Sequence, residues 1–226
     1  MINLIVVAHP DDEVLGFGGT GASYVSSGDS VQPIILCGGV EARSKRPSDE
    51  ELLLNIFKAN EILGFNKPIL GKFPNIGMNL IQHLEIVKYI EEQIIKYQPD
   101  RIFTHHPSDL NDDHKKISEA CMAAARISQR KNNIKPINAL YFMEILSSTD
   151  WAFASSNCST FAPNVFVDIN ETFNKKLEAL SCYKDVMREP PHPRSNEVLR
   201  GHAAYRGGQS GFLLAEAFQQ VYRNNL

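Results

Sequence analysis

The chain has 226 residues, of which 43% are hydrophobic and 22% charged, so it is long enough to bury a core without disulfides. A formal net charge of −3 excludes the global basic footprint of a nucleic-acid binder, and we expect a small-molecule partner and no nucleic acid. The apolar run at the N-terminus is too short for a signal peptide or a membrane span, and the four scattered cysteines form no Cys-x-x-Cys pair. Together these features predict a cytoplasmic protein with reduced thiols.

Strand and helix patterns alternate along most of the chain. In chain order they predict a strand at 2–7, a helix at 14–27, a strand at 31–36, a helix from Ser48 to Ile62, a strand at 69–73, a helix at 80–97, a strand at 101–104, a helix at about 114–130, and strands at 139–145 and 165–169. Asn170 is expected to cap a further helix, and the tail segment AEAFQQVY, residues 215–222, is also expected to be helical.

This alternation predicts an α/β fold in a single domain spanning 1–226. We expect a Rossmann-like, doubly wound, mostly parallel sheet between two helical layers. In such a sheet, with strand order 3-2-1-4-5, the first and fourth strands are neighbours at the point where ligands bind beyond the carboxyl ends. The segments that follow strands 2–7 and 101–104 should therefore meet.

Polar clusters follow both of these strands. The motif AHPDDE, residues 8–13, places three carboxylates beside an imidazole, an arrangement that is costly to bury unless a positive group holds it. Two histidines and a carboxylate form the ligand set of catalytic zinc, which His9, Asp12 and His114 can supply from the two clusters. Imidazole ligands favour zinc over magnesium, with Fe²⁺ as the alternative.

Simpler interpretations stay open for these motifs. In a plain strand-to-helix turn, Asp11 or Asp12 would cap the first helix, and Asp112 or Asp113 would cap the helix near 114. The segment GFGGTG, residues 16–21, formally matches a dinucleotide-binding fingerprint, but AHPDDE occupies the turn where that fingerprint would begin. We interpret these glycines as allowing the first helix to pack closely on the sheet.

Four motifs together resemble the PIG-L/LmbE-like zinc-dependent de-N-acetylases, which remove acetyl groups from N-acetylglucosamine-type sugars. These are AHPDDE, the pattern H-P-x-D-x-N-x-D-H at 106–114, HPRS at 192–195 and AEAF at 215–218. The resemblance spans nearly the whole chain. It implies His9, Asp12 and His114 as zinc ligands and Asp11 as the general base. The implied function is a zinc-dependent N-deacetylase of an N-acetylated amino sugar or its conjugate.

The sequence departs from the family pattern at two places. Some relatives have a histidine three residues before the last zinc ligand, where this chain has Asn111. We therefore consider His106 or His192 for stabilising the oxyanion, and Asp113 for orienting an imidazole. The second departure lies at 73–79, where Phe73-Pro74-Asn75 and Asn79 stand in place of the more usual aspartates.

Several further side chains are candidates for contact with the substrate. Arg43 follows the second strand, and Arg194 and Arg206 lie in a Pro- and Gly-rich tail that could form a lip over the metal and bind phosphate. For each arginine the alternative is a solvated surface position. Trp151 and Phe153 either wall a sugar pocket or simply pack. A deacylase of a non-sugar amide and a non-catalytic nucleotide-binding module are the rival functions, and formation of a homo-oligomer is left open.

Overall fold

The computed structural model describes residues 1–39, 47–153 and 159–224, and these form a seven-stranded sheet of order β3-β2-β1-β4-β5-β7-β6. Strands β1 to β5 are parallel, and β7 runs antiparallel to both β5 and β6. The predicted Rossmann-like α/β fold with a mostly parallel sheet is therefore confirmed. The strands are β1 (Ile2–Val7), β2 (Ser30–Ile35), β3 (Ile69–Leu70), β4 (Arg101–His105), β5 (Ala139–Met143), β6 (Val165–Asp168) and β7 (Ala215–Arg223).

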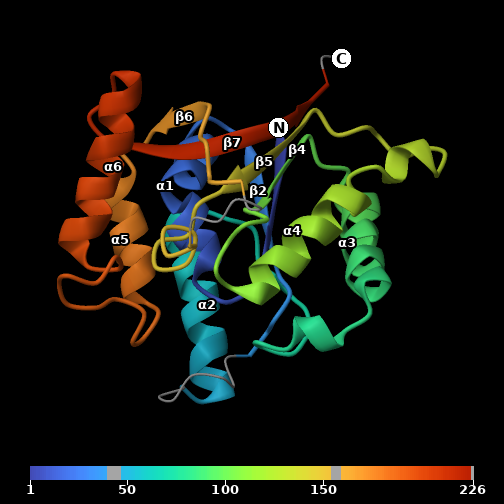
Figure 1. Ribbon diagram of the computed structural model, residues 1–226, viewed down its shortest axis with the longest axis horizontal. Coiled ribbons are helices and arrows are strands. Elements are labelled where there is room, and N and C mark those ends of the chain that lie inside the picture. Colours follow the sequence, from blue (N-terminus) through green and yellow to red (C-terminus); the bar gives the residue numbers. More distant parts are fainter. Residues whose placement is uncertain (40–46, 154–158, 225–226) are drawn as a thin grey trace.

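Helices cover both faces of the sheet (Figure 1). One layer holds α1 (Asp12–Ser26), α2 (Asp49–Leu63), α5 (Phe173–Ser181) and α6 (Asn196–Ser210), and the other holds α3 (His83–Tyr97) and α4 (Asp112–Ala124). Short 3₁₀ turns lie at Met78–Leu80 and Ile127–Gln129. Strand β1 is apolar from Leu4 to Val7 because both of its faces are covered: Ile5 and Val7 point into one core, and Leu4 and Val6 point into the other. No helix in the described ranges is long and apolar enough to cross a bilayer.

Most element boundaries follow the local signals. The side chain of Ser48 accepts a hydrogen bond from the Glu51 backbone nitrogen at the start of α2, and that helix ends at Gly64, whose φ is 76°. At the start of α4 the cap is Asn111, whose side chain accepts from the Asp113 nitrogen, so neither Asp112 nor Asp113 caps this helix. The capping role expected for Asn170 was wrong, because α5 begins only after Thr172.

The helix expected in the tail was also wrong. Residues Ala215–Arg223 form β7, which pairs on one side with β5 and on the other with β6. Alanine and glutamate favour helix, but this preference is worth only tenths of a kcal/mol per residue and is overridden by two ladders of backbone hydrogen bonds. Phe218 from β7 is fully buried in the core against Phe17 and Phe103.

The glycines of α1 permit close packing, as expected from the sequence. A Cβ on Gly16 would lie 2.7 Å from the side chains of Met143 and Ile145, and one on Gly19 would lie 2.9 Å from Ile169. The same helix is stabilised by a distant carboxylate. Glu216 on β7 accepts hydrogen bonds from the backbone nitrogens of Gly19 and Thr20.

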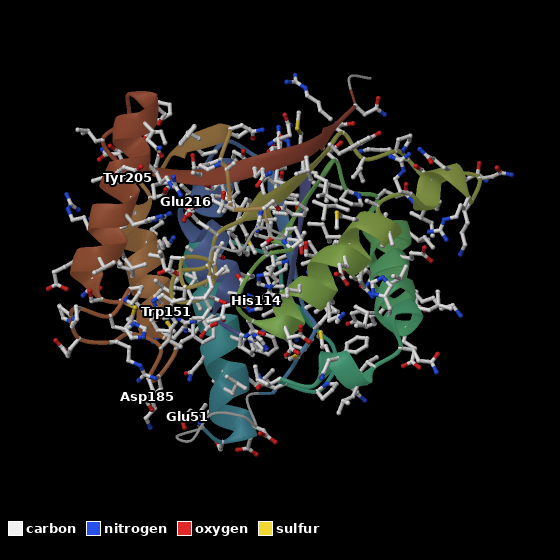
Figure 2. All side chains as sticks on the ribbon, viewed as in Figure 1. Glu51, His114, Trp151, Asp185, Tyr205 and Glu216 are labelled. Carbon is white, nitrogen blue, oxygen red and sulfur yellow. The ribbon has the colours of Figure 1, made fainter. Side chains whose placement is uncertain are left out.

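Glu216 also forms a buried ion pair, 2.7 Å long, with Lys176 of α5, whose ammonium donates in turn to the Leu15 carbonyl. Figure 2 shows Glu216 beside α1. We expect Glu216→Ala to lower the free energy of unfolding by about 3–5 kcal/mol, because the Lys176 charge would stay buried without its partner. Chemical denaturation measures this. Lys184→Ala breaks the exposed pair with Glu51 and is the control, with a change within about 1 kcal/mol. Similar losses in the two variants would contradict a special role for Glu216.

Candidate metal centre and cleft

The two polar clusters meet because β1 and β4 are parallel neighbours. Beyond the carboxyl ends of these strands lies a cleft of about 260 Å³. The loop after β1 and the start of α4 contribute His9, Asp11, Asp12, Asn111 and His114 to its lining, and the remaining lining residues are Asn75, Ile76, Ser147, Ser148 and Arg194. His114 lies near the centre of the molecule, where α4 begins (Figure 2).

Three of these side chains form a compact triangle of ligand atoms. His9 Nδ1 lies 3.3 Å from His114 Nε2, His9 Nδ1 lies 3.4 Å from Asp12 Oδ2, and His114 Nε2 lies 3.2 Å from that same oxygen. Zinc bonds of about 2.0–2.1 Å at the tetrahedral angle separate neighbouring ligand atoms by about 3.3 Å. The spacing of the triangle therefore fits three ligands of one tetrahedral ion. A second group of three candidate ligands, His9, Cys37 and Asp113, shares its histidine with the first.

Carboxylates stand behind both imidazoles. Asp113 Oδ2 lies 2.9 Å from His9 Nε2, and the Asp113 carboxylate is itself held by the backbone nitrogens of Ile76 and Met78. Asp109 Oδ2 lies 3.2 Å from His114 Nδ1. Each carboxylate leaves the opposite ring nitrogen facing the triangle, which is how metal-ligating histidines are usually oriented.

The electrostatics of the cluster favour positive charge. Burial works to lower the pKa of His114, but the charges of Asp12 and Asp109 outweigh it and raise that pKa to about 9. Burial likewise opposes protonation of His9, yet its contacts with Asp113 and Asp12 raise its pKa well above the usual value. Without a metal, protons therefore compensate the carboxylates. A divalent ion would supply the same compensation.

His105 has a different role from its neighbours. It is fully buried and stacks on the His114 ring at 3.8 Å between centroids. Its Nε2 accepts a hydrogen bond from the Ala8 nitrogen, so the ring is neutral, and burial together with the His114 charge lowers its pKa to about 3. His105 thus links β4 to the loop after β1.

Asp11 shares the cleft without belonging to the triangle. It adopts φ 109°, a strained conformation for a residue with a side chain, and its side chain makes no cap hydrogen bond to α1. Its backbone nitrogen donates to the buried Glu13 carboxylate. Asn60 and Tyr183 also donate to that carboxylate, and burial raises its pKa to about 7. Arg194 Nη1 lies 3.4 Å from Asp11 Oδ2, so the tail does reach the cleft.

Other residues expected at the site lie elsewhere. His106 is buried between Phe142 and Phe161, and it lines a separate small pocket. His192 packs on Trp151 and does not line the cleft. Arg206 makes two hydrogen bonds to Glu144 and is not brought to the cleft either. Phe153 is largely exposed, and Arg43 falls outside the described residues.

Some cleft residues were missed because only the fold brings them there. Ser147 accepts a hydrogen bond of 2.7 Å from Arg194 Nε, and the hydroxyl groups of Ser148 and Thr149 donate to Asp109. Their segment, SST after the fifth strand, carries no motif by itself. The only sequence feature that could have placed this segment at the cleft was its position just beyond a predicted parallel strand.

The chain is similar in sequence and in fold to several known proteins. A diacetylchitobiose deacetylase of Thermococcus kodakarensis is 26% identical, covering 96% of this chain and 82% of that protein. The N,N'-diacetylchitobiose deacetylase of Pyrococcus horikoshii superposes with a TM-score of 0.79 at 20% identity, covering 97% of this chain and 83% of that one. A 4-carboxy-2-hydroxymuconate hydratase of Pseudomonas putida KT2440 gives a TM-score of 0.78 at 20% identity, covering 100% and 98%. Because a hydratase shares the fold, the fold alone does not select the reaction.

The doubly wound sheet thus brings a candidate metal centre and the Asp11 carboxylate into one cleft, a combination that is suited to hydrolysis. The family model described as GlcNAc-PI de-N-acetylase matches residues 4–125, which hold both polar clusters. The chain belongs to this PIG-L family and is a deacetylase of that family.

Proposed function

We propose that this deacetylase removes the N-acetyl group from an N-acetylated amino sugar or its conjugate, with His9, Asp12 and His114 holding zinc. The observation that carries the proposal is the triangle of ligand atoms, 3.2 to 3.4 Å on each side, with Asp11 beside it in the same cleft. The sugar is inferred from the deacetylase relatives named above. Zinc is inferred from the ligand set of two imidazoles and one carboxylate, with Fe²⁺ as the alternative.

Zinc held by His9, Asp12 and His114 would supply Lewis acidity for polarising an amide carbonyl and for making water easier to deprotonate. The chain supplies the proton transfers and the positioning. Asp11 takes the proton from the attacking water and returns it to the departing amine, a role worth about 10²–10⁴-fold in rate. Arg194, whose Nη1 lies 3.4 Å from Asp11 Oδ2, positions the Asp11 carboxylate. Asp113 and Asp109 hold the two ligand imidazoles.

Release of acetate from a panel of N-acetyl sugars, sugar nucleotides and simple N-acetyl amines tests this proposal. The purified protein should contain one zinc per chain and release acetate from sugars in preference to the simple amines. If acetate were released only from the simple N-acetyl amines, the proposed sugar substrate would be wrong and the proposed metal site would stand. A protein that binds no stoichiometric metal and releases no acetate would contradict the proposal.

The two tail arginines should respond differently to substitution. Arg194→Ala should lower kcat/KM, because Arg194 contacts Asp11 in the cleft. The expected loss of transition-state stabilisation is about 1.5–3 kcal/mol, the range for hydrogen bonds to charged groups. Arg206→Ala should lower stability, because the partly buried Glu144 would lose its two hydrogen bonds from Arg206 and keep only His202 as a charged neighbour, and it should leave kcat/KM unchanged. Steady-state kinetics on N-acetylglucosamine and on a sugar nucleotide measure both. If Arg194→Ala lowered kcat/KM only for the sugar nucleotide, Arg194 would be a contact for the substrate phosphate. Equal losses of kcat/KM in the Arg194 and Arg206 variants would contradict the different roles assigned to these two arginines.

A further inference from the structure

The proposed hydrolysis requires a hydrogen-bond donor at the acetyl oxygen. A water oxygen bonds to the carbonyl carbon and the π electron pair moves to the acetyl oxygen. The C–N bond then breaks as nitrogen receives the proton, which gives acetate and an amine. Donors aimed at the charged oxygen lower the barrier to this step. His106 and His192, the histidines expected in this role, do not line the cleft.

Most side-chain donors in the cleft lining already have protein acceptors. Ser148 donates to Asp109, Asn75 Nδ2 donates to the Gly39 carbonyl, and Arg194 donates to three groups of the protein, Asp11 among them. Among the described side chains of the cleft lining other than the two ligand histidines, the Asn111 amide and the Ser147 hydroxyl donate to no protein acceptor, whereas Asn75 and Arg194 are already oriented by the hydrogen bonds that they donate to the protein. Ser147 accepts a hydrogen bond from Arg194 Nε, and the same guanidinium contacts Asp11.

The orientation of the Asn111 amide is set by its backbone neighbours. A backbone nitrogen can only donate, so the Asp113 nitrogen, 3.0 Å away, requires the amide oxygen Oδ1 to face it. This leaves the Nδ2 group, with its two hydrogens, for the cleft that Asn111 lines. Asn111 is half-buried, so a substrate can reach it.

We propose that Asn111 Nδ2 donates a hydrogen bond to the acetyl oxygen as negative charge develops there, which makes Asn111 a catalytic residue. This inference rests on the proposed function. Asn111 caps α4, whose first turn carries His114 of the metal centre and Asp113 behind His9. The cap therefore holds the donor in a fixed relation to the metal ligands, and the positive end of the helix dipole acts in the same direction.

Substitutions that keep the cap and remove the amide donor test the proposal. Asn111→Ser and Asn111→Asp both retain a good capping side chain. Each should lower kcat by about 10²–10³-fold, with KM, bound metal and melting temperature close to those of the wild type. Ser48→Ala is the control for loss of a helix cap, because Ser48 caps α2 outside the cleft, and it should keep the wild-type kcat. Ser147→Ala should cost much less in kcat than the Asn111 variants.

Binding provides a second measurement that does not depend on turnover. A methylphosphonamidate analogue of N-acetylglucosamine, which carries a tetrahedral anion, should bind Asn111→Ser at least about tenfold more weakly than the wild type, while N-acetylglucosamine should bind both equally. Normal kcat in both Asn111 variants, or an equal kcat loss in Ser147→Ala, would overturn the inference and leave the proposed function intact. A wild type that releases no acetate would reject the proposed function and this inference with it.

Discussion

Asp11→Asn should keep the bound metal ion and lose most of kcat, with little change in KM. The amide cannot take a proton, and general base catalysis is worth about 10²–10⁴-fold. Asparagine is the right replacement because residue 11 adopts φ 109°, a region that asparagine tolerates better than alanine does. Kinetics together with elemental analysis of the same preparation measure both expectations.

The matched control for this change is Asp168→Asn, which makes the same chemical substitution at an exposed position at the end of β6. It should have the kinetics of the wild type. Near-normal turnover in Asp11→Asn would remove Asp11 from the role of base. Loss of the metal in that variant would instead make Asp11 a ligand.

His114→Ala should raise the zinc dissociation constant by more than about 100-fold. Replacing a residue that only hydrogen-bonds to a metal ligand costs up to about 100-fold, and loss of a ligand itself should cost more. It removes one corner of the ligand triangle and leaves Asp12 and Asp109 without the imidazole that both approach. Zinc titration of the metal-free protein measures this. His83→Ala, at the exposed start of α3, should bind zinc normally, and Asp113→Asn should show an intermediate loss of about 10–100-fold. A His114→Ala protein with full metal content would contradict this ligand assignment.

The zinc titration should also depend on pH. In the metal-free protein the Asp12 and Asp109 charges raise the pKa of His114 to about 9 against the opposing effect of burial, so the ring is protonated at neutral pH. Zinc must displace that proton, and affinity should therefore rise with pH until about pH 9. His114→Ala should have a shallower pH dependence. A wild-type affinity independent of pH between 6 and 9 would contradict protonation of the metal-free site.

Much of the site was predictable because it follows from strand order. A buried apolar strand followed by AHPDDE, and a second one followed by a polar segment ending in His114, locate both clusters at the same edge of the sheet once β1 and β4 are neighbours. His9, Asp12 and His114 do form one group of ligand atoms. Their roles as ligands, and the role of Asp11 as base, remain predictions for the experiments above.

The tail shows where local patterns were insufficient. Arg194 and Arg206 look alike in sequence, each in a Pro- and Gly-rich neighbourhood, yet one faces Asp11 and the other is bound by Glu144. The helical composition of residues 215–222 competes with an open edge of β5, and backbone pairing decides the outcome. No pattern within the tail contains information about these distant partners.

The sequence by itself determined the α/β class, the strand order up to the fifth strand, and the residue types that gather at the cleft. These features depend on hydrophobic periodicity, turn residues and motif spacing, which are local properties of the chain. Only the tertiary structure decided which of those side chains face one another. It brought Glu216 to the backbone of α1, directed Asp113 to His9, moved His106 away from the cleft, and left the Asn111 amide without a protein acceptor among the described residues. Such choices depend on packing between elements far apart in the chain, where each buried polar group must find its partner.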